Sequence, residues 1–392
     1  MKIIYHHRTR STDAQRIHIL EIARAFEELG HQVEIVSLVP TDTAPHDAKR
    51  DAENPLWQRL ARSIPFAYEM VQLGYNLLGI PMLLRKVLRE KTGFIYERYS
   101  LFNFTGVAVA RMCGVPIVLE VNSPFALEQV RDKDIRLHRF AQWTEKVICN
   151  LATCVIVVST PLRRIMEQAG VRPEKIHVMT NGVRLEHFQP QLLSEITRRS
   201  LGIRNGETVI GFVGWFRKWH GLENLLEAFA KSGLSGRAKV MLIGDGQAMP
   251  DLQRYVKDQR LEGDVIFTGP LPHAQIPAYV SAIDIAVQPA ANEYCCPMKI
   301  LEYMAVGKPI VAPRQENIQD LLRDEEEAQY FTPGDVDSLA GALKALVEDP
   351  ERARRMGERV RKTITERGFL WTENAARVVR LVEADPALCD RL

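Results

Sequence analysis

Short β-rich runs alternate with helical stretches through the whole chain, and the pattern restarts near its middle. The strand candidates are residues 3–7, 32–38, 94–98, 116–121, 155–159 and 176–179, followed by 208–214, 239–243, 264–268, 285–288, 309–312 and 329–331. Strands separated by helices favour parallel sheets covered by helices on both faces. Because 392 residues suit two such domains, we predict an α/β fold of two Rossmann-like, doubly wound domains facing each other across a cleft.

We expect the first domain to cover residues 1–186 and the second to cover residues 187–369. A last helix within residues 370–392 is expected to pack back on the first domain. The polar run 189–200, at the start of the second domain, is interpreted as a linker. Residues 42–64, within the first domain, are interpreted as a surface excursion. Ligands of doubly wound sheets bind at the carboxyl ends of the strands, so the cleft is the expected site.

Composition and charge limit the functional classes. About a quarter of the residues are charged, as in ordinary globular proteins, and no apolar run reaches the length of a transmembrane helix. The N-terminus reads directly into a strand without a signal-peptide pattern, and the six cysteines lack the spacing of metal ligands or a disulfide framework. We therefore expect a cytoplasmic protein with reduced thiols and no nucleic-acid partner.

The net charge is unevenly distributed along the chain. Residues 1–190 carry 25 Lys+Arg against 20 Asp+Glu, whereas the remainder carries 26 against 29. A basic first half suggests an anionic partner such as a membrane surface or a lipid phosphate, although uneven surface charge without function explains the numbers equally well. The amphipathic stretch 66–91 ends in several basic residues. It reads either as a packing helix or as a peripheral contact with the inner membrane face.

The segment 297–312 carries the most specific functional signal. It joins a helix to a strand through a glycine turn and places one carboxylate, Glu302, in an otherwise apolar helix. Pro297 suits the first helical position. A helix that begins after a parallel strand offers free N–H groups to an anion such as a phosphate. An acid one turn further along the helix could bind the hydroxyl groups of the molecule that carries this phosphate. An ordinary capped helix with a solvent-facing Glu is the alternative.

Other loops after predicted strands narrow the chemistry. The loop 8–13 contains no glycine, so a dinucleotide fingerprint is absent. Basic residues lie between two tryptophans in the loop 214–221, where they could neutralise a diphosphate. Asp245 reads as a turn or capping residue. The D-x-D matches at 132–134 and 335–337 follow no predicted strand, so we expect no metal and no cofactor.

Taken in order, four segments resemble retaining glycosyltransferases with the GT-B fold, and more narrowly the family 4 type, glycosyl transferases group 1. They are Asn181-Gly182-Val183 with Phe188-Gln189-Pro190, Ile243-Gly244-Asp245-Gly246, Phe267-Thr268-Gly269 and residues 297–312. The resemblance covers essentially the full length. It implies an acceptor-side first domain and a second domain that binds a nucleotide sugar.

The resemblance also implies site residues, although the E-x7-E motif is degenerate. Glu302 matches the ribose-binding Glu, but Tyr294 stands where the first Glu should be. Trp215 and His220 replace the diphosphate Arg and Lys, and Asn122 replaces a donor-side His. We expect catalytic groups at Asn122, Arg217, His220 and Lys299, and donor-binding residues at Trp215, Lys218, Gly244, Gly269, Leu271, Tyr294, Cys296, Pro297, Met298 and Glu302. An acceptor or phosphate loop would include Arg10, Ser11, Thr12 and His18.

The implied function is transfer of a sugar from a UDP- or GDP-sugar to a glycan or a polyprenyl-phosphate-linked acceptor, with retention and without a metal. The departures from the motif are similar to those of a subgroup that assembles bacterial surface polysaccharides. A nucleotide-sugar epimerase and a catalytically inactive nucleotide-sugar-binding protein of the same fold are the alternatives.

Overall fold

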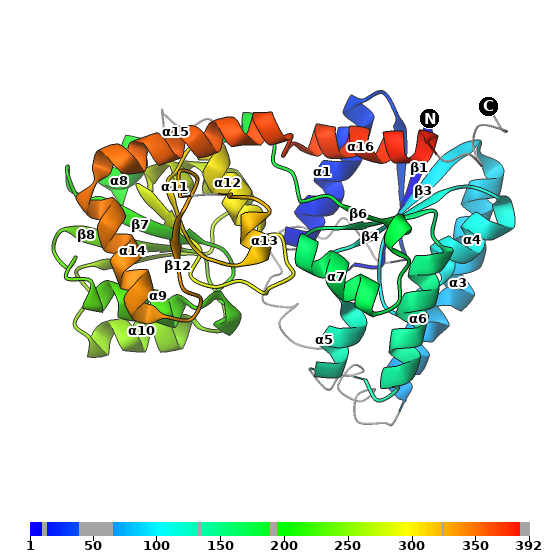
Figure 1. The fold of residues 1–392 in the computed structure, drawn as a ribbon, viewed down its shortest axis with the longest axis horizontal. Helices are drawn as coiled ribbons and strands as arrows, with labels where there is room; N and C mark the ends of the chain where they lie inside the picture. The colour runs from blue at the N-terminus through cyan, green and yellow to red at the C-terminus, as the bar shows by residue number, and fades with distance from the viewer. Residues whose placement is uncertain (10–13, 39–65, 132–134, 189–193, 324, 385–392) are drawn as a thin grey trace. The chain divides into compact units, whose positions relative to one another are not determined.

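A computed structural model describes residues 1–9, 14–38, 66–131, 135–188, 194–323 and 325–384 of the chain. The chain divides into two compact units, residues 1–180 together with 371–392, and residues 181–370. Each unit is built on one six-stranded parallel sheet with flanking helices (Figure 1). This confirms the predicted fold of two doubly wound α/β domains. The predicted surface excursion 42–64 and the D-x-D match at 132–134 lie outside the described residues.

The sheet of the first unit has the strand order β2-β1-β3-β4-β5-β6. Its inner strands are mostly buried, whereas the edge strands β2 and β6 are largely not; β4, for example, is buried at every position, as expected of a parallel strand covered on both faces. The strands are β1 (Lys2–His6), β2 (Gln32–Val36), β3 (Thr92–Arg98), β4 (Ile117–Val121), β5 (Cys154–Val157) and β6 (Ile176–Val178). All six predicted strands of this half are present.

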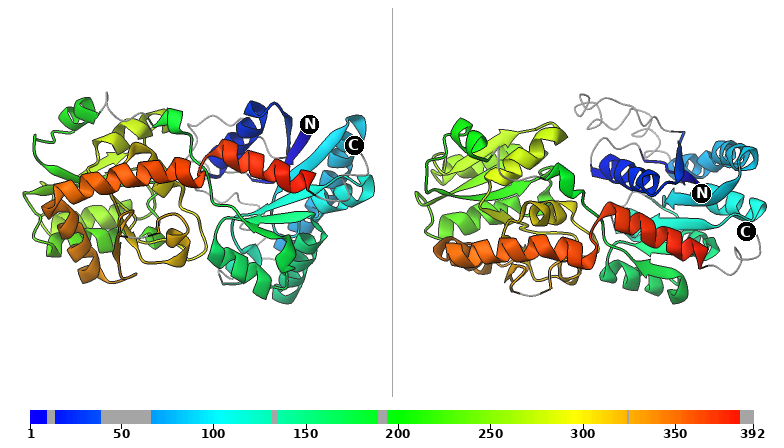
Figure 2. Two further views of the ribbon diagram at one scale, coloured as in Figure 1. Left: turned by 45° about the horizontal axis from the view of Figure 1, so that its top comes forward. Right: turned by 90° about the horizontal axis from the view of Figure 1, so that it is seen from above.

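The helices of the first unit include one from the far end of the chain. They are α1 (Ala14–Glu28), α3 (Ala67–Arg89), α4 (Thr105–Cys113), α5 (Phe125–Arg131), α6 (His138–Leu151), α7 (Thr160–Gln168), the 3-10 turn η2 (Pro173–Lys175) and α16 (Trp371–Glu383). The last helix, α16, lies beside α1 in every view (Figures 1 and 2). Its Asn374 Nδ2 donates to the carbonyl of Thr180 at 2.8 Å.

The sheet of the second unit has the order β12-β11-β10-β7-β8-β9. Its strands are β7 (Thr208–Val213), β8 (Ala238–Ile243), β9 (Val265–Gly269), β10 (Ile285–Val287), β11 (Ile310–Pro313) and β12 (Gln329–Phe331). On one face α9 packs with α10 and α14 over a large buried apolar core; on the other, α11 packs with α8 and α12 with α15 (Figure 1).

These helices are α8 (Ser194–Ser200), α9 (Leu222–Lys231), α10 (Met249–Asp258), α11 (Ile276–Ala282), α12 (Met298–Val306), α13 (Glu316–Gln319), α14 (Val336–Glu348) and α15 (Pro350–Arg367). The 3-10 turns are η3 (Leu185–His187), η4 (Lys218–His220) and η5 (His273–Gln275). Local signals fit their ends. Asp335, from the second D-x-D match, caps α14 by accepting from Ser338 N at 2.9 Å.

Two local predictions are wrong. Part of the expected linker 189–200 is helix α8, because Arg198 fastens this polar segment through bonds to the Ala282 carbonyl at 2.9 Å and the Asp284 carboxylate at 2.8 Å. Pro297 does not occupy the first helical position. It has an extended backbone and precedes the first helical residue, Met298.

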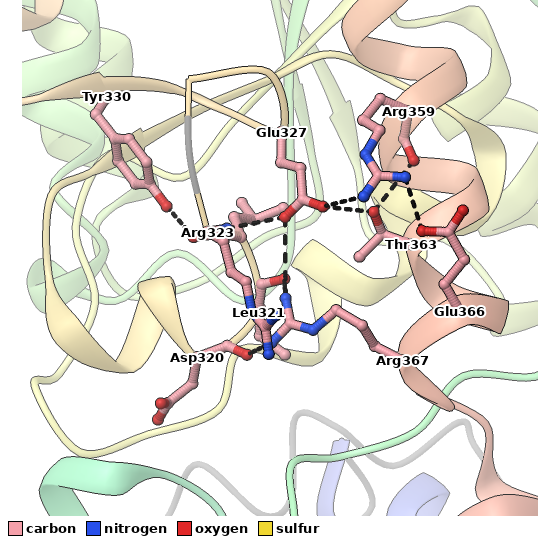
Figure 3. A network of polar contacts seen from close by, with 10 residues as sticks. Asp320, Leu321, Arg323, Glu327, Tyr330, Arg359, Thr363, Glu366 and Arg367 are labelled. Atoms are coloured by element: carbon pink, nitrogen blue, oxygen red, sulfur yellow. Dashed lines mark hydrogen bonds and ion pairs between the residues drawn. The ribbon is translucent and has the colours of Figure 1, made fainter.

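A buried carboxylate fastens the segment after α13 to α15 (Figure 3). Glu327 accepts from Arg323 N at 2.8 Å and from Thr363 Oγ1 at 2.6 Å, and it pairs with Arg359 at 3.5 Å. Arg367 Nη1 donates to the Leu321 carbonyl at 2.6 Å. Since a buried carboxylate needs several donors to offset its lost hydration, this network fixes the positions of residues 320–323 and of Glu327.

We predict that the close approach of α12 and α15 tolerates no side chain at Gly357. A Cβ there would lie 2.2 Å from the carbonyl oxygen of Gly307, which ends α12. Gly357→Ala should therefore destabilise the protein by about 2–4 kcal/mol in urea unfolding. In the matched control Gly341→Ala, the Cβ meets nothing within 4 Å, so a gain of about 0.5–1 kcal/mol is expected. Equal effects of the two substitutions would contradict the packing argument.

Candidate active site

The second unit brings Lys299, at the start of α12, against the loop that follows β7. Lys299 Nζ lies 3.1 Å from His220 Nε2 and 4.3 Å from the centroid of the Phe212 ring. Gly214 leaves room for this side chain, because a Cβ there would lie 3.3 Å from Lys299 Nζ. Two predicted catalytic groups, separated by 79 residues, are therefore in contact.

The environment shifts the pKa values of this group. Burial and the nearby Lys299 charge lower the pKa of His220 to about 3, so the imidazole is neutral at physiological pH. Burial lowers the pKa of Lys299 to about 8, and burial raises the pKa of Glu302 to about 7. A neutral His220 therefore accepts a hydrogen bond from the Lys299 ammonium at Nε2, whereas Lys299 can supply charge and hydrogen bonds to an anion.

The loop before α12 is held by side-chain amides that bind its carbonyl oxygens. Asn317 Nδ2 bridges two of these carbonyls, Asn292 O at 2.9 Å and Cys295 O at 2.8 Å. Asn181 Nδ2 donates to Cys296 O at 2.9 Å, and Gln288 and Gln315 bind the carbonyls of residues 290 and 291. The carbonyl and the next N–H of a trans peptide point in opposite directions, so the N–H groups of Glu293 and Cys296 face away from these amides.

The beginning of α12 adds backbone donors next to this loop. Ile300 N already donates to the Pro297 carbonyl at 3.1 Å, but Met298 and Lys299 occupy the first two helical positions, whose N–H groups have no carbonyl one turn earlier in the helix. Tyr303, on the inner side of α12, accepts from Val213 N at 3.0 Å and ties the helix to β7. The arrangement can bind an anion at a defined position relative to Glu302.

The remaining predicted donor residues lie in the same unit. Gly244 and Gly269 form an isolated bridge just beyond β8 and at the end of β9, and Leu271 follows two residues later. Trp215, Arg217 and Lys218 are exposed after β7, whereas Tyr294 and Cys296 are buried. Burial raises the pKa of the Cys296 thiol, which accepts from Asn181 N at 3.3 Å, so this cysteine is a structural group.

In the first unit, Glu120 joins two further predicted site residues. Its carboxylate binds His18 Nε2 at 3.0 Å and the side-chain amide of Asn122, together with Tyr96 OH at 2.9 Å and Arg98 Nη1 at 3.4 Å. Burial would raise the pKa of Glu120, but the charges of His18 and Arg98 outweigh it and hold that pKa below its usual value. Arg10, Ser11 and Thr12 lie outside the described residues.

A second buried polar group at the same sheet edge was not predicted. His6 and Glu97 are register partners on β1 and β3; the two side chains form a hydrogen bond, and His6 Nε2 lies 3.1 Å from Tyr75 OH on α3. Neither this group nor the amides of Gln315 and Asn317 belongs to a sequence motif. The signal in the sequence that could have identified His6 and Glu97 is their position as polar residues at the carboxyl ends of buried strands.

We predict a pH-dependent stability from Glu302. Between about pH 4.5 and 7 the native protein retains the Glu302 proton that the unfolded chain releases, so this group makes the free energy of unfolding fall as the pH rises through that window. Glu302→Gln should be more stable than the wild type by about 1–3 kcal/mol near pH 8, with little gain near pH 4.5, in urea unfolding without nucleotide. The exposed control Glu358→Gln should show no such difference. A pH-independent gain for Glu302→Gln would refute the assigned shift.

Two family models cover most of the chain. Residues 15–187 match Glycosyltransferase Family 4, and residues 194–363 match Glycosyl transferases group 1. Among the residues that the structure describes, no helix is both long enough and apolar enough to cross a membrane.

Curated relatives and solved structures agree with these matches. The chain is 27% identical to the UDP-Gal:alpha-D-GlcNAc-diphosphoundecaprenol alpha-1,3-galactosyltransferase of Escherichia coli over 73% of this chain and 74% of that protein. It is 23% identical to the MMP alpha-(1->4)-mannosyltransferase of Mycolicibacterium hassiacum over 94% of each. Its fold matches that of Anabaena HepE in complex with UDP, with a TM-score of 0.73 and 19% identity, over 98% of this chain and 100% of HepE. The chain therefore belongs to the family 4 type of glycosyltransferases, glycosyl transferases group 1, and has the GT-B fold.

Proposed function

We propose that this glycosyltransferase moves a sugar from a UDP- or GDP-sugar to a glycan or lipid-linked acceptor, with retention of configuration and without a metal, in the synthesis of bacterial surface polysaccharide. The contact of Lys299 with His220 at the start of α12 carries the proposal. A diphosphate beside Lys299 would receive charge and hydrogen bonds from the ammonium, which His220 orients, and further hydrogen bonds from the backbone N–H groups of Met298 and Lys299.

Glu302 then has a defined role. It lies three residues after Lys299 on α12, and its carboxylate would accept hydrogen bonds from the ribose hydroxyls of the same nucleotide. Burial discourages its ionised form, and hydroxyl donors favour that form, so nucleotide binding would lower the Glu302 pKa from about 7.

The reaction places its main demand on the leaving diphosphate, which gains negative charge as the glycosidic bond breaks. Lys299 and the helix N–H groups would stabilise that negative charge. The exposed side chains of Arg217 and Lys218 would stabilise it further. In the retaining mechanism proposed here, a diphosphate oxygen takes the acceptor proton. No protein nucleophile is needed, and the protein cations would serve in place of a metal.

The names of related proteins support the donor and acceptor classes. The Escherichia coli relative is named for UDP-Gal and a diphosphoundecaprenol acceptor, and HepE has been solved with UDP and with UDP-glucose. On these grounds we propose that the preferred donor is a UDP-sugar rather than a GDP-sugar, and that the preferred acceptor is a lipid diphosphate rather than a free glycan.

We predict that Glu302→Ala weakens UDP binding on the order of tenfold to a hundredfold in calorimetry, because the ribose hydroxyls lose a charged acceptor. Lys299→Met should weaken UDP more than uridine, since uridine has no diphosphate. The exposed helical control Glu358→Ala should leave both affinities unchanged. Unchanged UDP affinity in Glu302→Ala would remove this residue from the donor site.

Turnover with a panel of UDP- and GDP-sugars separates the proposed reaction from its alternatives. Nucleotide release that depends on acceptor, persists in EDTA and yields a product with the anomeric configuration of the donor is the expected result, read by proton NMR. An altered sugar still attached to its nucleotide would instead identify an epimerase. Binding without turnover of any donor would identify a protein that lacks transferase activity.

A further inference from the structure

The outer face of α3 carries a cluster of exposed apolar side chains. Of the 17 large apolar side chains exposed among the described residues, six lie on α3 or on Phe66, which precedes it; they are Phe66, Met70, Val71, Leu77, Leu78 and Leu88. Leu77 is 80% exposed and Leu78 is 66% exposed. Single exposed apolar residues are ordinary, but a contiguous cluster on one helix marks an interaction surface.

The helical period shows that this cluster is one continuous stripe. At 3.6 residues per turn, Met70, Leu77, Pro81 and Leu88 fall close to one line along the helix, with Val71 and Leu78 beside it. The opposite side of α3 is buried at Glu69, Gly79, Leu83 and Val87. A Cβ at Gly79 would lie 2.6 Å from Thr105 Oγ1, so α3 approaches α4 closely on that side. The apolar stripe is therefore the outward face of a helix that is already packed.

The exposed charged side chains within α3 are basic, whereas Glu90, which follows the helix, is paired with Lys2. Arg85, Arg89 and Lys91 are exposed at the C-terminal end of the helix. The acid within α3, Glu69, is buried and accepts from Arg136 N at 2.6 Å and from Leu137 N at 3.2 Å. An apolar stripe that ends in cations is the pattern of a helix that lies in the interface of an anionic membrane, with its apolar side chains among the acyl chains and its cations at the phosphates.

We propose that this outer face of α3 docks on an anionic lipid surface. A second copy of the chain fits less well, because a twofold contact would pair the patch with itself, and the exposed residues 70–89 include no Asp or Glu to meet the cations.

The inner side of the same helix connects this surface to the sheet edge of the first unit. Tyr75 OH lies 3.1 Å from His6 Nε2 at the end of β1, and Arg8 Nη1 donates to the Gln72 carbonyl at 3.1 Å. The Arg8 guanidinium lies 4.7 Å from the centroid of the Tyr75 ring. A helix docked on lipid would thus hold His6 and Arg8 near the membrane. This consequence rests on the proposed function, because it matters for an acceptor carried on a lipid.

Vesicle flotation tests the surface directly, with the full chain and without donor or acceptor. The wild type should float with phosphatidylcholine vesicles that contain phosphatidylglycerol and much less with phosphatidylcholine alone. Leu77→Glu combined with Leu78→Glu should reduce the bound fraction by about tenfold or more, because both apolar contacts are lost. Arg85→Glu combined with Arg89→Glu should abolish the dependence on phosphatidylglycerol. The control Ile196→Glu alters a side chain that is 65% exposed on α8 and should float like the wild type.

Thermal unfolding and UDP affinity should be unchanged in all these variants, which separates this surface from the donor site. Flotation of the double Leu variant equal to the wild type, or a wild type that binds no vesicles, would overturn the proposal. So would a wild-type dimer in analytical ultracentrifugation that the Leu77 and Leu78 substitutions dissociate, since the stripe would then be an interface between copies. The vesicle result holds whether or not sugar transfer is observed.

Discussion

The contact between the partly buried ammonium of Lys299 and the His220 ring is the interaction on which the proposed donor site depends. The ammonium lies at the start of α12, 3.1 Å from a His220 ring that its own charge helps to keep neutral. A neutral imidazole does not balance a positive charge, and burial lowers the pKa of Lys299 to about 8. The site therefore favours an anion before any ligand arrives, which supports the proposed position of the donor diphosphate at the start of α12.

Buried polar networks, rather than glycines, hold the backbone around the start of α12 in place. Asn317 holds the two carbonyls of the loop before α12, and the segment that follows Asn317 is fixed to α15 through Glu327 (Figure 3). In the first unit Glu120 orients Asn122 and His18 in a comparable way. Each network supplies hydrogen-bond partners to several buried groups at once, so the loss of one member leaves other buried groups without a partner.

The fold was predictable from the sequence because its signals are local. All twelve predicted strands are present, since buried parallel strands are continuous apolar runs and the helices between them are amphipathic. The helix α8 was missed because a polar surface helix held by Arg198 resembles a linker in composition. The family resemblance supplied the candidate site, including Glu302 and the replacement of the first motif Glu by Tyr294.

The supporting residues could not be predicted because their contacts depend on sheet order and register. His6 meets Glu97 only because β1 pairs with β3 in a register that places these residues side by side, although they are 91 residues apart. Likewise, Asn317 reaches residue 292 across the end of the sheet, where no spacing rule connects the two. Motifs identify groups that touch a ligand, whereas the groups that hold them are visible only in three dimensions.

The ionisation of Lys299 tests the central claim most directly. NMR of side-chain ammonium or adjacent carbon resonances, assigned with Lys299→Arg, can follow its titration with and without UDP. Without nucleotide the pKa should lie near 8, and a diphosphate bound beside the ammonium should raise it, because an anion favours the charged form. A Lys299 pKa that stays the same when UDP saturates the protein would contradict the placement of the donor diphosphate at the start of α12.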